Sequence, residues 1–173
     1  MAIALYDQTV AAYLQGLEGV AGVLDKGLAH AQATGVDPDG LLESRLAPDM
    51  HPLRFQVQCA AHFSQGVIDS LKAGIFSPPE PWSASRYADL QALVAETRGS
   101  LSKLSREEVN SLAGRDLLFQ AGEFKLPFVA EDFLTSFAIP NFYFHTTTAY
   151  GILRAGGVGL AKRDYMGTLK VKR

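Results

Sequence analysis

Four long stretches of the chain repeat apolar residues at helical spacing, and this repetition restricts the fold more than any other feature. Apolar residues three and four positions apart lie on one face of an α-helix, so each stretch predicts an amphipathic helix. The stretches cover residues 3–31, 51–74, 83–104 and 130–155, with ends set to within a few residues. Four such helices bury their apolar faces against one another, which predicts an all-α four-helix bundle.

Glycine and proline residues mark the ends of these predicted helices. Gly35 follows the first helix, and Pro52 suits the first position of the second, where its missing N–H has no partner anyway. Gly74 is a stop signal for the second helix, although Ile75 still fits its apolar stripe. Pro140 predicts a kink inside the last helix.

The segments between the long helices predict shorter elements. A helical turn is expected near residues 41–47, and the capping box from Ser105 to Glu108 opens another short helix. Two apolar runs flank Ala121-Gly122 and predict a small β-hairpin before the last helix. The proline-rich segment 77–81 is a stiff linker, but it does not separate two foldable halves, so residues 1–173 form a single domain.

Charge and cysteine content exclude several classes of protein. The net charge of −2 lacks the basic footprint of a nucleic-acid-binding protein. A single cysteine, Cys59, cannot form an internal disulfide, which favours a reducing, cytoplasmic location, and the first residues do not resemble a secretory signal. Residues 133–153 lack formal charge over 21 positions, but Pro140, Asn141 and a run of threonines predict a buried helix instead of a membrane span.

Basic residues are concentrated in the C-terminal tail, residues 162–173. The tail holds five basic residues and one acid, so its net charge is +4 and that of the remaining chain is −6. Such asymmetry can mark an anion-binding arm, but a solvated, frayed terminus is the commoner case. Tyr165 and Met166 are expected to anchor the first half of the tail on the bundle.

Two histidines are candidates for chemistry. His145 lies beside the apolar stripe of the last predicted helix, with Asn141 four residues before it and Ala149 four residues after. It is either a buried histidine bonded to a neighbouring polar group or a metal ligand without its helical partner. His62, on the second helix, is either a partly exposed polar residue or a ligand that meets His145 across the bundle.

Several segments together resemble a known family. They are PNFYFHTTTAYGILR at residues 140–154, GVGLAKRDY at 157–165, DMHPL at 49–53 and QVQ at 56–58. The chain resembles a bacterial and fungal family of unknown function in the DinB/YfiT-like superfamily of metalloenzymes. The resemblance implies a DinB-like four-helix bundle and a homodimer. It also implies a divalent metal, Zn or Ni, held by three histidines.

Only His62 and His145 match the ligand positions that the resemblance implies, so the metal site is incomplete. We therefore keep two hypotheses. The first is a dimeric ligand-binding or structural protein whose pocket candidates are Gln58, His62, Asn141, His145 and Tyr150. The second is a divergent metal-dependent enzyme, of the thiol-dependent transferase or isomerase type, that uses His62 and His145. Neither hypothesis involves a nucleic acid or a membrane, and the sequence names no substrate.

Overall fold

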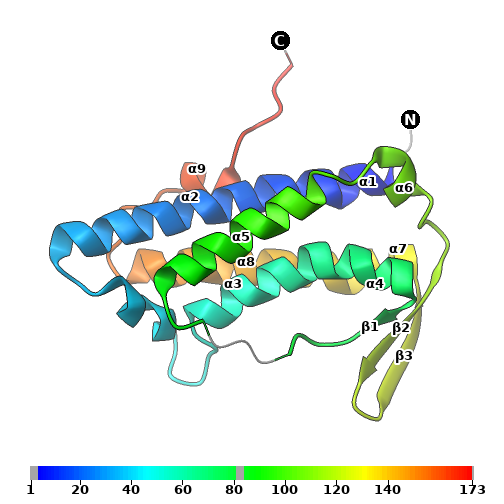
Figure 1. The fold of residues 1–173 in the computed structure, drawn as a ribbon, viewed down its shortest axis with the longest axis horizontal. Coiled ribbons are helices and arrows are strands. Elements are labelled where there is room, and N and C mark those ends of the chain that lie inside the picture. Colours follow the sequence, from blue (N-terminus) through cyan, green and yellow to red (C-terminus); the bar gives the residue numbers. More distant parts are fainter. Residues whose placement is uncertain (1–3, 81–83, 173) are drawn as a thin grey trace.

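Four helical segments pack side by side in the computed structural model, which describes residues 4–80 and 84–172 (Figure 1). The second and the last segments each contain a π-helical turn, η2 and η3. The segments are α2 (Val10–Thr34), α3–η2–α4 (Leu53–Ala61, His62–Gly66, Val67–Ala73), α5 (Tyr87–Leu101) and α7–η3–α8 (Ala130–Phe133, Leu134–Ala138, Ile139–Ala155). The predicted helical bundle is therefore present.

Short helices and a small sheet complete the described fold. The helices are α1 (Leu5–Gln8), the 3₁₀-helix η1 (Pro38–Glu43), α6 (Arg106–Asn110) and α9 (Lys162–Met166). The strands are β1 (Ile75–Phe76), β2 (Asp116–Ala121) and β3 (Phe124–Val129), in the order β1-β2-β3. The all-α class is thus corrected to a mostly helical bundle with a three-stranded sheet at one end (Figure 1).

Most predicted helix ends agree with the structure. Gly35 and Gly74 adopt φ angles of 71° and 78°, the left-handed conformation that ends a helix and that glycine adopts without steric cost. The Ser105 side chain accepts a bond from the Glu108 backbone N–H, as a helix N-cap does. Pro52 was predicted at the first helical position, but the helix begins at Leu53 and Pro52 is its N-cap residue.

Two helix starts differ from the sequence prediction. The first segment is interrupted at Thr9, whose φ and ψ of −112° and −90° separate α1 from α2. The third helix begins at Tyr87, later than predicted, and the predicted start at Ser83 lies outside the described residues. Asp89 accounts for the later start, because its carboxylate accepts the backbone N–H groups of Ser85 and Arg86 and caps the helix there.

The predicted hairpin is confirmed, and a third strand joins it. Ala121 pairs with Phe124 across a two-residue turn, in which Gly122 has the positive φ of 59° that such turns require. Strand β1 runs parallel to β2, with Ile75 opposite Leu118. Periodicity assigned Ile75 to the preceding helix, but the left-handed Gly74 turns the chain into an extended strand first.

Pro127 protects the outer edge of the sheet. Its partner Leu118 donates its backbone N–H to the Gly74 carbonyl on the β1 side, so the backbone groups of the Leu118–Pro127 pair face away from each other. Proline therefore costs no hydrogen bond between β2 and β3. It also removes a donor from the free edge of β3, which opposes pairing with another chain.

The π-helical turn η3 ends at Ala138, two residues before Pro140 in the last helix. Proline has no N–H, and in a regular helix its ring clashes with the carbonyl four residues earlier, here that of Ser136. The wider turn is the local irregularity expected near this residue. Among the helices of the described residues, none is both long and apolar enough to cross a membrane.

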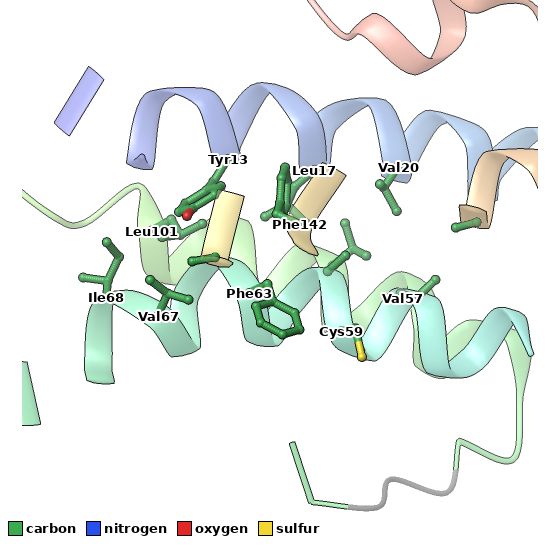
Figure 2. Packing of buried hydrophobic residues seen from close by; sticks show 14 of the residues in the cluster. Tyr13, Leu17, Val20, Val57, Cys59, Phe63, Val67, Ile68, Leu101 and Phe142 are labelled. Atoms are coloured by element: carbon green, nitrogen blue, oxygen red, sulfur yellow. The ribbon is translucent and has the colours of Figure 1, made fainter. Parts of the chain in front are cut away.

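The core lies between α2 and the other helical segments (Figure 2). Tyr13 of α2 packs against Phe142 of α8 with ring centroids 4.8 Å apart. Gly16 allows this approach, because a Cβ atom there would lie 2.7 Å from the Phe142 ring. Each large apolar side chain buried in this way contributes about 1.5–3 kcal/mol relative to exposure.

The first half of the C-terminal tail folds back along α2 (Figure 1). Lys26 of α2 forms an ion pair with Asp164 of α9, at 2.7 Å. The Glu18 carboxylate accepts bonds from the backbone N–H and the hydroxyl of Thr168, at 3.1 and 2.8 Å. Residues 162–168 are therefore anchored instead of frayed, and Arg173 lies outside the described residues.

Glycine residues allow the close contact between α2 and the C-terminal tail. A Cβ atom at Gly19 would lie 2.1 Å from the carbonyl oxygen of Tyr165, so another residue would displace the tail. Gly167 has a φ of 63°, and a Cβ atom there would lie 2.6 Å from the Gln15 carbonyl oxygen. Tyr165 was expected to anchor the tail, and its ring lies 5.9 Å from that of Tyr150.

Candidate functional site

A cleft of 680 Å³ lies between the second helical segment, α5 and the chain that follows β1. We call residues 77–80 the strap and this hollow the strap cleft. It is lined by Gln58, Ala61, His62, Ser70, Ile75, Ser77, Pro78, Pro79, Glu80 and Leu93. Its volume falls in the range of small-molecule pockets, about 300–1,000 Å³.

The strap is held to the second helical segment by two predicted pocket residues. Gln58 and His62 lie one helical turn apart, so their side chains lie on one face. The Gln58 amide donates to the backbone carbonyl of Glu80, and Nε2 of His62 lies 2.8 Å from the carbonyl oxygen of Ser77. Because a carbonyl only accepts, Nε2 of His62 carries the proton.

His62 presents a neutral ring to the strap cleft. Burial lowers the pKa of His62, and the bond to Ser77 only partly opposes this effect. With the proton on Nε2, Nδ1 is a hydrogen-bond acceptor. It lies beside Gly66, where a Cβ atom would come within 3.1 Å of it. His62 also opens the π-helical turn η2, a kind of irregularity that is frequent at functional sites.

His145 lies in the interior, where it is 8% exposed, and is bonded to a glutamine that the sequence analysis did not single out. Nδ1 of His145 lies 2.8 Å from Oε1 of Gln56, and Nε2 of Gln56 donates to the His51 carbonyl oxygen at 2.9 Å. The second bond sets the orientation of the amide. Oε1 must therefore accept from Nδ1–H of His145, which leaves Nε2 of His145 with its lone pair.

Burial keeps His145 uncharged. It lowers the pKa of His145 to about 4, and the nearby His51 ring adds a smaller effect in the same direction. Phe63 stacks on the His145 ring at 5.6 Å between centroids, and Phe144 meets it edge-on at 5.3 Å. His145 is thus a neutral histidine of fixed tautomer.

His62 and His145 both contact the ring of Phe63 but bond to different acceptors. The Phe63 ring packs against both, at 5.7 Å from His62 and 5.6 Å from His145. Nowhere in residues 4–80 and 84–172 do three or more His, Cys, Asp or Glu side chains form a group that could hold a metal ion. The described residues therefore do not fit the three-ligand site that a catalytic metal requires.

The other predicted pocket residues lie away from the strap cleft. Asn141 donates to the Phe137 carbonyl one turn earlier in the last helix, at 2.8 Å. Tyr150 lies beside the tail residue Tyr165. Cys59 is buried, and burial raises the pKa of its thiol to about 12, which makes it a packing residue and not a nucleophile.

Sequence reasoning missed four residues of this region: Gln56, Ser70, Ser77 and Glu80. Gln56 carried a usable signal, because it is a polar residue on the apolar stripe of the second helix and such a residue needs a buried partner. Ser77 and Glu80 carried no signal for their bonds to the helix, since these bonds use backbone carbonyls of the linker. Any residue type supplies that carbonyl.

Comparisons with known proteins agree with the fold. Residues 5–166 match the model of a family described as a domain of unknown function (DUF1993). A crystal structure described as a DinB family member protein from Shewanella denitrificans is similar, with a TM-score of 0.82 and 33% sequence identity. The match covers 98% of this chain and 95% of that chain, which confirms the predicted DinB-like fold. No curated protein matches the sequence.

The low pKa of His145 predicts a pH-dependent stability. In the unfolded chain His145 has its ordinary pKa of 6.5 and binds a proton below this pH. In the folded protein it stays neutral until the pH approaches 4. Stability is therefore lost as the pH falls below 6.5, and the free energy of unfolding should drop by about 2 kcal/mol from pH 7 to pH 5. Urea unfolding at both pH values measures this difference.

Two variants locate the effect. His145→Gln should reduce the pH dependence whatever its own stability, leaving the contribution of His62, whose pKa burial also lowers, whereas His30→Gln, at the far end of α2, should keep the full dependence. The lowered pKa of the Glu18 carboxyl acts only below its ordinary value of 4.5, outside this pH window. An unchanged slope in His145→Gln would contradict the assignment.

Proposed function

The chain belongs to the family described as a domain of unknown function (DUF1993), and from this premise and its own geometry we propose that it is a small-molecule-binding protein whose ligand occupies the strap cleft. The observation that carries the proposal is the 680 Å³ cleft, in which the histidine ring of His62 stands among apolar side chains. A large hollow with a few convergent polar groups is the usual form of a ligand site.

The charges of the strap cleft favour a neutral or cationic ligand. Glu80 carries the one formal charge among the ten lining residues, and the lowered pKa of His62 keeps that ring neutral at pH 7. Nδ1 of His62 would accept a hydrogen bond from the ligand. Ile75, Leu93 and the strap prolines would contact its apolar body. An anion would meet no cation there.

Three probes of one shape test this preference. Benzamide is neutral, benzylamine is cationic and benzoate is anionic at pH 7. In NMR titrations, we expect benzamide and benzylamine to shift the backbone amides of Ala61, Ser70 and Leu93, because the strap cleft offers apolar walls, an acceptor and a carboxylate. Benzoate should leave these amides unchanged.

A matched pair of variants locates the binding. Leu93→Trp fills the cleft and should abolish the benzamide shifts, while Ala95→Trp, on the exposed side of α5, should retain them. Benzamide shifts that survive Leu93→Trp, or that cluster away from the strap cleft, would contradict the proposal.

The metal-dependent alternative is favoured by a single observation. The bond from Nδ1–H of His145 to Gln56 leaves Nε2 with a lone pair. A metal-bound histidine is oriented in the same way, because its other ring nitrogen usually donates to a neighbouring acceptor. His62 uses its own Nε2 in the bond to Ser77, and the described residues offer no third ligand. We therefore derive no reaction step from a metal.

Metal analysis tests this alternative. Protein purified without an affinity tag should contain Zn or Ni far below one equivalent per chain, because a stable site requires about three protein ligands. The His145→Ala variant, prepared in parallel, should contain the same trace. One equivalent in the unmodified protein that is lost in His145→Ala would establish the metal-dependent alternative instead.

We also propose that the protein is a homodimer, as the resemblance to the DinB/YfiT-like superfamily implies. Phe144 and Tyr143 of α8 support an interface on this helix, since their side chains are 57% and 41% exposed. Adjacent exposed aromatic residues commonly mark interaction surfaces.

Light scattering at micromolar concentration should give twice the chain mass of 18.7 kDa. Phe144→Glu should lower the measured mass to that of the monomer, because a carboxylate would be buried in the interface. Leu169→Glu, at an equally exposed position in the tail, should remain dimeric. A monomeric mass for the unmodified protein would overturn the dimer.

A further inference from the structure

A second hollow of 440 Å³ lies where α1, α2, α5 and α6 meet the C-terminal tail. We call it the tail groove. Its charged residues are Arg98, Arg106, Lys170, Asp7 and Glu18. The strap cleft shares no lining residue with it, so the two hollows can be tested separately.

Arg98 brings an unsatisfied donor to the tail groove. Its Nε atom is buried and has no hydrogen-bond partner. Within the described part of the chain, no ion pair to its guanidinium is found. A buried N–H without an acceptor is costly, and an arginine makes it more so because it cannot lose its charge. The guanidinium therefore calls for an acceptor.

The two acids of the tail groove are already engaged. Asp7 is paired with Arg106 at 2.5 Å, and this bond holds the pKa of the Asp7 carboxyl below its usual value. Both oxygens of Glu18 accept bonds from Thr168, which lower the pKa of that carboxyl, and the charge of Arg98 adds a smaller effect in the same direction without a hydrogen bond between the two side chains. Three cations thus face two ionised acids that have partners, and a positive charge is left over.

Apolar side chains form the remaining wall of the tail groove. Ala11 and Leu14 of α2 line it together with the Tyr6 ring, over which the Arg106 guanidinium lies at 4.8 Å. An inorganic anion would use only the cations, whereas an organic acid would contact both. We propose that the tail groove binds a small organic carboxylate, with its carboxylate on Arg98 and Lys170 and its apolar body against Tyr6 and Leu14.

The docked tail completes this site. Lys170 and Thr168 belong to the segment that follows Gly167, and Glu18 holds Thr168 in place. The ammonium of Lys170 is close enough to the Asp7 carboxyl to lower its pKa. The excess of basic residues in the tail therefore supplies one of the two cations that bind the ligand.

Benzoate, benzamide and inorganic phosphate test the proposal in NMR titrations of the full-length protein. Benzoate should shift the backbone amides of Leu14, Glu18 and Arg98 and saturate. Benzamide, of the same shape without the charge, should leave them unchanged, which is the reverse of the preference expected at the strap cleft. Phosphate should bind at least tenfold more weakly than benzoate, since it gains nothing from the apolar wall.

Arg98→Gln should weaken benzoate binding at least tenfold, because a charge-assisted bidentate contact is lost. Lys170→Gln should weaken it less. Arg163→Gln, which removes the same charge from an exposed tail position outside the groove, should bind as the unmodified protein does. Thermal melts check that each variant is folded. Equal binding of benzoate and benzamide, tighter binding of phosphate, or benzoate affinity unchanged in both Arg98→Gln and Lys170→Gln would overturn the proposal.

Discussion

Phe63 is the residue around which the half of the molecule that holds the strap cleft is arranged. Its ring stacks on His145 of the last helix, meets His62 edge-on and contacts Phe76 of strand β1 at 5.5 Å. One buried ring thus joins the second helical segment, the last helix and the sheet. Aromatic contacts of this kind add about 0.5–1.5 kcal/mol each beyond the burial of their area. Phe63 therefore contacts both His62, which lines the strap cleft, and the buried His145.

The sequence predicted the bundle because apolar periodicity is a local property, which can be recognised in each helix without knowledge of its neighbours. Gly35 and Gly74 were identified as stops for the same reason, since a left-handed residue after an apolar stripe needs no tertiary information. Strand β1 could not be predicted in this way. Ile75 and Phe76 become a strand only because β2, about forty residues later, supplies their hydrogen bonds.

The candidate site shows the same division between local and distant information. His62 was identified by residue type, and its role in holding the strap depends on a backbone carbonyl that no side-chain pattern reveals. The last helix supplied three of the five predicted pocket residues, yet several of its polar side chains bond within the fold. Thr148 donates to the Phe144 carbonyl one turn earlier, and Thr147 donates to the hydroxyl of Tyr165. A polar residue that finds a partner within a turn or in the docked tail needs no ligand.

The two hollows differ in which of their charged side chains lack a partner, and this difference is clearer than any difference in net charge. The overall charge of −2 conceals a basic tail, whose single acid, Asp164, is paired with Lys26 of α2. Among the charged residues that line the two hollows, those whose side chains have neither an ion pair nor a hydrogen bond within the described residues are Arg98 and Lys170 in the tail groove and Glu80 at the strap cleft. A side chain that is already paired gains little from a ligand, because the new bond replaces an old one. The unpaired groups therefore decide which ligands each hollow can hold, and their opposite signs give the two hollows opposite preferences.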